Sequence, residues 1–153
     1  MDKINIQIKG VKKLTKQLEN ISKEVDNEVE AITRITAEDI STNAKFSAPV
    51  GTPESTGIKG YLGGTLRQSI TAFAVNSKTW AVAAFAKYAP YVEFGTGGSV
   101  EVPNELKDLV IRFKGKGIRR INLPARPFLY PAFVKGRGQY IKDLKKLLKR
   151  VTK

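Results

Sequence analysis

The feature that most constrains the fold of this chain is a long series of apolar residues at helical spacing. Between Val11 and Ile40, apolar side chains recur at steps of three to five residues, which is the period of an amphipathic α-helix. A helix running to about Phe46 would be on the order of 50 Å long at 1.5 Å per residue. Ala48 and Pro49 end it, because a proline disfavours the helical conformation in the residue before it.

The apolar stripe of this helix predicts which of its side chains form the core. The expected core residues are Leu14, Leu18, Ile21, Val25 and Val29. On this interpretation Leu18→Ala is expected to destabilise the protein by about 2 to 5 kcal/mol, and Lys16→Ala to have almost no effect.

Four further elements follow from local patterns. Residues 3–9 alternate apolar and polar side chains, which predicts a strand. Residues 65–75 and 80–85 are two β-prone runs joined by a polar turn, which predicts an antiparallel hairpin. Residues 88–94 predict a short helix. Residues 130–151 predict a last helix with one apolar face, made of Phe133, Tyr140, Ile141, Leu144, Leu147, Leu148 and Val151.

Together these elements predict an α+β fold with one domain over residues 1–153. A small, mainly antiparallel sheet would carry the long N-terminal helix and the C-terminal helix on one face, as a two-layer domain requires. Residues 50–64 are rich in glycine and proline and predict a flexible loop, which is either a plain connector or a segment ordered by a neighbouring subunit. Residues 98–122 predict a projecting loop or hairpin arm.

Two unusual motifs stand out. The first concentrates aromatics, one acid and a Gly-Thr-Gly break, namely Tyr88, Tyr91, Glu93, Phe94, Gly95, Thr96 and Gly97. The second is proline-rich and leads into the last helix, with Pro124, Arg126, Pro127, Phe128 and Pro131. A carboxylate inside an apolar run is either exposed or paired when buried. We therefore predict a Glu93–Arg126 ion pair, whose loss in Arg126→Ala would cost about 3 kcal/mol if it is buried.

The composition excludes most enzyme chemistry. The 153 residues include no cysteine and no histidine, so disulfides, thiolate or imidazole metal sites and Ser-His or Cys nucleophile systems are absent. Acids such as Glu93 and Asp108 have no catalytic partner at a recognisable spacing. We expect no enzyme, no catalytic residues, no cofactor and no metal. No apolar run reaches the roughly 20 residues that a membrane span needs, and no signal-peptide core is visible.

The charge is strongly basic and unevenly spread. The chain has 27 basic and 14 acidic residues and a formal net charge of +13. The first 56 residues are close to neutral, with 8 basic and 9 acidic residues, and the rest is basic. This asymmetry indicates a polyanionic neighbour, either DNA or an acidic protein surface. A solvated basic face that serves solubility is the alternative.

The order and spacing of these motifs resemble a known family. YVEFGTG, followed by PARPFLYPAF and preceded by Ala-Pro-Val-Gly-Thr and Thr-Leu-Arg-Gln-Ser-Ile, is similar to the gene-ten-product-like family of long-tailed bacteriophages. The resemblance runs from the first helix to the end of the chain. The family's usual Asp-Thr-Gly is here Gly51-Thr52-Pro53, followed by an extension to Gly64.

The resemblance implies a structural protein of the virion neck or tail-completion region. Because no signal peptide is visible, we expect the protein in the host cytoplasm during assembly and then in the virion. Such minor tail proteins form a ring around the DNA exit path, with head-closure proteins and tail-terminator or tail-tube proteins as neighbours. DNA would pass nearby without being read by sequence. A basic DNA-binding protein is the alternative function, and a steep salt dependence of binding to duplex would favour it.

The 98–122 arm is the expected subunit interface. Its apolar residues exceed what a phosphate-contacting finger needs, and its cations would answer acidic residues on a neighbour. The expected interface residues are Ile111, Phe113, Lys114, Lys116, Ile118, Arg119 and Arg120.

Overall fold

The structure is a computed structural model that describes residues 11–57, 59–60, 62–96, 104 and 124–152. The expected strand at residues 3–9 and the expected interface residues of the 98–122 arm lie outside these ranges.

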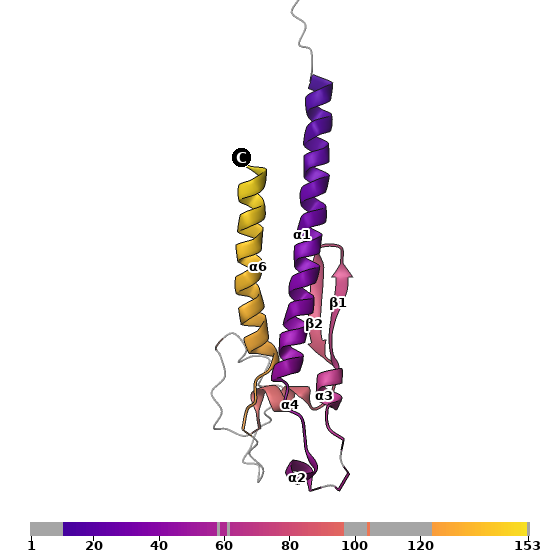
Figure 1. Cartoon of the computed structure of the whole chain (residues 1–153), viewed down its shortest axis with the longest axis vertical. Helices are drawn as coiled ribbons and strands as arrows, with labels where there is room; N and C mark the ends of the chain where they lie inside the picture. The colour runs from indigo at the N-terminus through magenta and orange to yellow at the C-terminus, as the bar shows by residue number, and fades with distance from the viewer. Residues whose placement is uncertain (1–10, 58, 61, 97–103, 105–123, 153) are drawn as a thin grey trace, which may run out of the picture.

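Two long antiparallel helices lie along the long axis of the molecule. Helix α1 covers Val11–Ser47 and α6 covers Leu129–Val151, and they lie side by side (Figure 1). The two strands β1 (Ile70–Asn76) and β2 (Thr79–Ala84) form an antiparallel hairpin that lies along α1. The expected α+β class is confirmed, as are the long first helix, the hairpin and the last helix.

Within the described residues, three short helices lie at one end of this assembly (Figure 1). They are α2 (Pro53–Thr56), α3 (Thr65–Gln68) and α4 (Ala89–Phe94). Helix α4 is the short helix expected from the first motif. Helix α3 corrects the expected start of the hairpin, because residues 65–68 are helical and the first strand begins at Ile70. Helix α2 lies within the 50–64 loop and is capped by reciprocal hydrogen bonds between Thr52 and Ser55.

The two strands of the hairpin pair in a defined register, and both contact α1. Ile70 pairs with Ala84 and Ala74 with Trp80, and the ladder becomes irregular between Ala74 and Asn76. A two-stranded sheet is marginally stable alone in water, and both strands gain their support from contacts with α1.

The core lies where α1, α3, α4 and the start of α6 converge. It is made of Ile40, Ala44, Ala48, Leu66, Ile70, Ala89, Phe128 and Ala132. The alanines of α1 allow the other elements to approach its backbone closely. Phe128 and Ile70 are the largest of the fully buried side chains.

The expectation for the core residues of α1 is wrong at Leu18 and Ile21, which are 59% and 47% exposed. Val25 and Val29 are partly buried, and the side chain of Leu14 lies outside the described part. The buried part of α1 instead begins at Ala37. Leu18→Ala is therefore expected to have little effect on the stability of the isolated chain.

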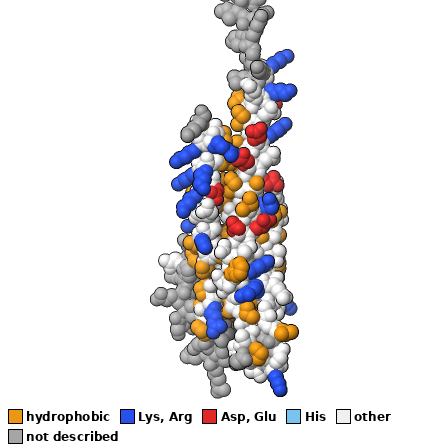
Figure 2. Space-filling view, viewed as in Figure 1, with side chains coloured by type: hydrophobic (Ala, Val, Ile, Leu, Met, Phe, Trp, Pro, Cys, Tyr) orange, Lys and Arg blue, Asp and Glu red, His pale blue; other side chains and the backbone are white. Residues whose placement is uncertain are grey.

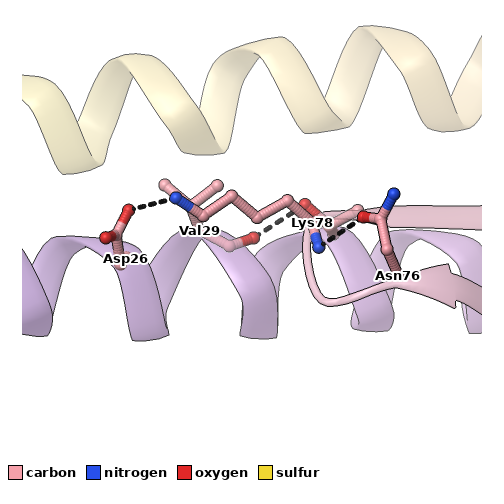
Figure 3. A network of polar contacts seen from close by, with 5 residues as sticks. Asp26, Val29, Asn76 and Lys78 are labelled. Carbon is pink, nitrogen blue, oxygen red and sulfur yellow. Dashed lines mark hydrogen bonds and ion pairs between the residues drawn. The ribbon is translucent and has the colours of Figure 1, made fainter.

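The positions of the hairpin turn and of the C-terminal end of α6 explain why the N-terminal part of α1 is exposed. In the turn, Lys78 donates from Nζ to Asp26 of α1 at 2.6 Å and from its backbone N–H to Asn76 at 3.0 Å (Figure 3). Near the end of α6, Arg150 pairs with Glu28. These pairs are exposed and add little stability, but they mark how far the described neighbours of α1, the hairpin and α6, extend along it. The first 15 residues of α1, to Val25, extend roughly 20 Å beyond that level.

The apolar face expected for α6 is also corrected. Leu147 is buried, and Tyr140 and Leu144 are partly buried. Ile141 and Leu148 are 45% and 62% exposed, because each lies one residue beyond a position that faces α1. The apolar residues of α6 thus occupy two stripes, of which only one is covered by α1.

Two glycines in α6 predict opposite effects on stability. A Cβ at Gly136 would lie 2.2 Å from Cγ1 of Ile40, so this glycine permits the close contact of α6 with α1. A Cβ at Gly138 would meet nothing within 4 Å. We expect Gly136→Ala to destabilise the protein by about 1 to 3 kcal/mol through overpacking, and Gly138→Ala to stabilise it by up to about 1 kcal/mol through helix propensity. Urea denaturation of both variants checks this, and two shifts of the same sign would contradict it.

Candidate functional site

The residue at the centre of the two motifs is Glu93, in the last turn of α4. Its side chain is 7% exposed, yet it carries a carboxylate, so its partners are decisive. Oε2 accepts hydrogen bonds from the backbone N–H groups of Phe128 at 2.8 Å and Leu129 at 2.9 Å. Oε1 accepts from the N–H of Tyr130 at 2.8 Å. One carboxylate therefore binds three consecutive amides at the start of α6.

The proline spacing of the second motif explains this arrangement. The first N–H groups of a helix have no partner within the helix, and α6 has no side-chain cap of its own. Pro127 and Pro131 flank the three amides, and a proline has no N–H to offer. Glu93 thus accepts from every backbone N–H between residues 127 and 131. Its negative charge also complements the positive end of the α6 dipole. We call this contact the Glu93 clip.

The predicted Glu93–Arg126 ion pair is wrong. Arg126 is exposed, and its backbone N–H donates to the carbonyl oxygen of Val92 at 2.8 Å. The ion pairs within the described residues do not include one between Glu93 and Arg126. The expected connection between the first motif and the last helix does exist, but backbone amides supply it. The Pro-x-x-x-Pro spacing after a lone apolar-flanked acid is the sequence signal that would have indicated it.

The other motif residues have mixed positions. Phe128 is 1% exposed and belongs to the core, and Gly95 has a φ of 68° that favours glycine. Thr96 is buried and Phe94 is partly buried, whereas Tyr88 and Tyr91 are partly exposed. Exposed positions are also occupied by Pro124, Pro127 and Pro131. Gly97 lies outside the described residues, as do all the arm residues expected at the subunit interface.

Beside the Glu93 clip lies an open groove of about 980 Å³. The groove runs between α1, β2, α4 and the first turns of α6. Its walls are mainly apolar, with Trp80, Val82 and Phe133 among them. Tyr140 and Thr33, at its side, share a hydrogen bond of 3.1 Å. A surface of this kind binds apolar side chains by burial and offers few polar groups for specificity.

The described residues offer neither a metal site nor a membrane span. No three His, Cys, Asp or Glu side chains gather there as a metal site would need. None of the described helices combines the length and the apolar character that crossing a bilayer requires.

These features define an elongated scaffold whose described surface includes the faces of two long helices and an apolar groove. Over residues 12–95 the sequence matches the family model described as "Bacteriophage HK97-gp10, putative tail-component". The match covers more than half of the chain, so the chain belongs to this family of phage tail-related structural proteins. A search of curated proteins and a search of solved structures found no match.

Proposed function

We propose that the protein is a subunit of a ring in the neck or tail-completion region of the virion, where it joins the head to the tail around the path of the DNA. Membership of a phage tail-component family supports a place in the particle. The observation that carries the proposal further is the uncovered apolar surface of the two long helices, including Leu18, Ile35 and Leu148 at 50% exposure or more. An assembly subunit covers such surface with its neighbours.

The proposed neighbours are the head-closure protein on one side and a tail-terminator or tail-tube protein on the other. The elongated shape suits such a bridging position (Figure 1). The 98–122 arm is proposed to reach an adjacent subunit. A structural role needs no catalytic group, and we propose none.

The test is a phage in which the gene is deleted and then supplied in trans. We expect deletion to give full heads and separate tails, and the wild-type chain to restore joined particles, as seen by electron microscopy. Normal particles from the deletion phage would show that the chain is not required for joining. Negative-stain images of the purified protein should show rings, which test the oligomer separately.

The arm supplies a second test of the same proposal. A chain lacking residues 107–120 is expected to keep the circular dichroism and thermal transition of the full chain, because α1, α6 and the hairpin pack against one another. It is also expected to fail in joining heads to tails. A deletion variant that still joins them would remove the arm from the interface.

A basic surface on α6 favours a second candidate function, contact with DNA. Figure 2 shows Lys and Arg side chains gathered along α6. A DNA-binding surface of this kind would give affinity for plain duplex that falls steeply with salt. Measuring binding to a short duplex at several salt concentrations separates this function from a purely structural one.

A further inference from the structure

The outer faces of α1 and α6 differ in charge but have the same arrangement of apolar residues. Each has a row of exposed apolar residues. On α1 the row is Ile21, Ile35 and Phe46, which are 47%, 50% and 78% exposed. On α6 it is Val134, Ile141 and Leu148, which are 43%, 45% and 62% exposed. We call them the α1 outer stripe and the α6 outer stripe. Because the α6 residues recur every seven positions, they form one straight line on the helix.

The charges around the two stripes are opposite. Between residues 19 and 39, α1 has seven acidic and two basic residues, whereas α6 has seven basic residues and one acidic residue. Figure 2 shows the acidic side chains on the middle of α1 and the basic ones along α6. The one acid of α6, Asp143, is already bound by Gln139 at 2.9 Å and Lys146 at 3.1 Å. These contacts lower the pKa of Asp143.

Pairing within the chain leaves much of this charge available. Of the seven acids, Asp26 pairs with Lys78, Glu28 with Arg150, and Glu38 with Arg34 of the same helix. Within the described part of the chain, Lys145 and Lys149 make no ion pair. Lys145 lies beside the α6 outer stripe, one turn from Ile141 and three residues from Leu148. The α6 outer stripe is therefore an apolar line with cations beside it.

Helix geometry places the two stripes on opposite sides of the helix pair. Ile40 and Thr33 face α6, and Gly136 and Tyr140 face α1. Each outer stripe lies roughly a third of a turn from the line that faces the partner helix. At 100° per residue, the α1 outer stripe is reached from the line that faces α6 by turning against the direction in which residue numbers increase. The α6 outer stripe is reached from the line that faces α1 by turning in that direction. In an antiparallel pair, offsets of opposite sense point to opposite sides, so one copy can use both stripes at once.

We propose that the α1 outer stripe of one copy packs against the α6 outer stripe of the next copy. The contact joins two different surfaces, so it is heterologous and repeats around a ring. Burial of the apolar rows provides adhesion, and the opposite charges orient the approach. The occupant of each stripe is thus a second copy of this chain. The proposal rests on the ring assembly proposed above and names the surfaces that build it.

The register of this contact follows from the protomer. Rotation about a ring axis parallel to the helices leaves the height of each residue unchanged. Within one copy, Thr33 is level with Tyr140 and Ile40 with Gly136. Ile35 is therefore within about one helical turn of the neighbour's Ile141 in height. These two residues form the centre of the proposed contact.

Cysteine cross-linking tests the contact directly, because the chain has no cysteine of its own. The variant Ile35→Cys with Ile141→Cys is expected to give a ladder of disulfide-linked oligomers under mild oxidation, in purified protein and in assembled particles. The matched control is Ile35→Cys with Lys142→Cys, which moves one thiol about 100° around α6. Since disulfides need a Cβ separation of about 4 Å, the control should give no ladder. Thermal transitions confirm that both variants are folded.

Each outcome decides the proposal. A ladder that appears with Ile141→Cys and not with Lys142→Cys supports it. Monomers from both double variants, or equal ladders from both, overturn it. If particles contain the chain and are joined but show no ladder, the stripes are wrong and the neck function stands. If the chain is absent from particles, the neck function fails whatever the ladder shows. Loss of the ladder on adding duplex DNA would assign the α6 cations to DNA and overturn the proposal.

Discussion

Replacing Glu93 with alanine is expected to lower the free energy of unfolding by about 3 to 5 kcal/mol, because three buried or partly buried amides lose the carboxylate that accepts from them. Those amides belong to Phe128, Leu129 and Tyr130, at distances of 2.8 to 2.9 Å. The substitution also removes a negative charge from the N-terminal end of α6. Urea denaturation followed by circular dichroism measures the loss.

Arg126→Ala is the matched control for this prediction. Arg126 is exposed and contributes a backbone amide to the junction, which alanine retains. Arg126→Ala is expected to lower the free energy of unfolding by about 0.5 kcal/mol or less. Glu93→Gln should lie between the two, since it keeps one acceptor oxygen and loses the charge. Equal losses of stability in Arg126→Ala and Glu93→Ala would support a Glu93–Arg126 ion pair and contradict the Glu93 clip.

Phe128→Ala is expected to cost about 3 to 5 kcal/mol through loss of buried apolar surface and the cavity left behind. Phe128 is 1% exposed and belongs to the same core cluster as Ile40 and Ile70. Phe46→Ala removes the same atoms from a side chain that is 78% exposed. Its effect on the dilute protein should be within about 0.5 kcal/mol.

The two phenylalanine variants also distinguish folding from assembly. We expect Phe128→Ala to lower the thermal transition of the dilute protein strongly and Phe46→Ala to leave it nearly unchanged. The measurement is a thermal melt at a concentration where sedimentation shows only monomers. A large shift for Phe46→Ala under those conditions would mean that its side chain supports the monomer fold.

The helices and the hairpin could be predicted from the sequence because their signals are local. The helical period from Val11 onward predicted α1, and the β-prone runs on either side of the 76–79 turn predicted the hairpin. The faces of the helices were harder to predict. A helix with apolar residues on two sides does not reveal which side the chain covers, so Leu18 was assigned to the core although it is 59% exposed. How far the hairpin and α6 extend along α1 decides this, and that is a property of the packed structure.

The junction between the two motifs could be predicted from the sequence in position but not in chemistry. Glu93 was correctly expected to join the aromatic motif to the last helix, and its partner was wrongly expected to be Arg126. Reasoning from side chains alone favours an ion pair for a buried acid. Every residue except proline has a backbone N–H, so residue types alone do not indicate which amides are free to donate. The prolines at 127 and 131 contained the missing information, since they mark which backbone groups can donate.

The Glu93 clip has a consequence for how this chain tolerates changes in length. Because Glu93 binds residues 128–130 and the carbonyl of Val92 binds the amide of Arg126, the chain leaves this junction after Thr96 and returns to it at Pro124. Doubling the length of a flexible closed loop costs only about 0.6 kcal/mol. We therefore expect insertions and deletions between the two motifs to leave the helices and the hairpin in place.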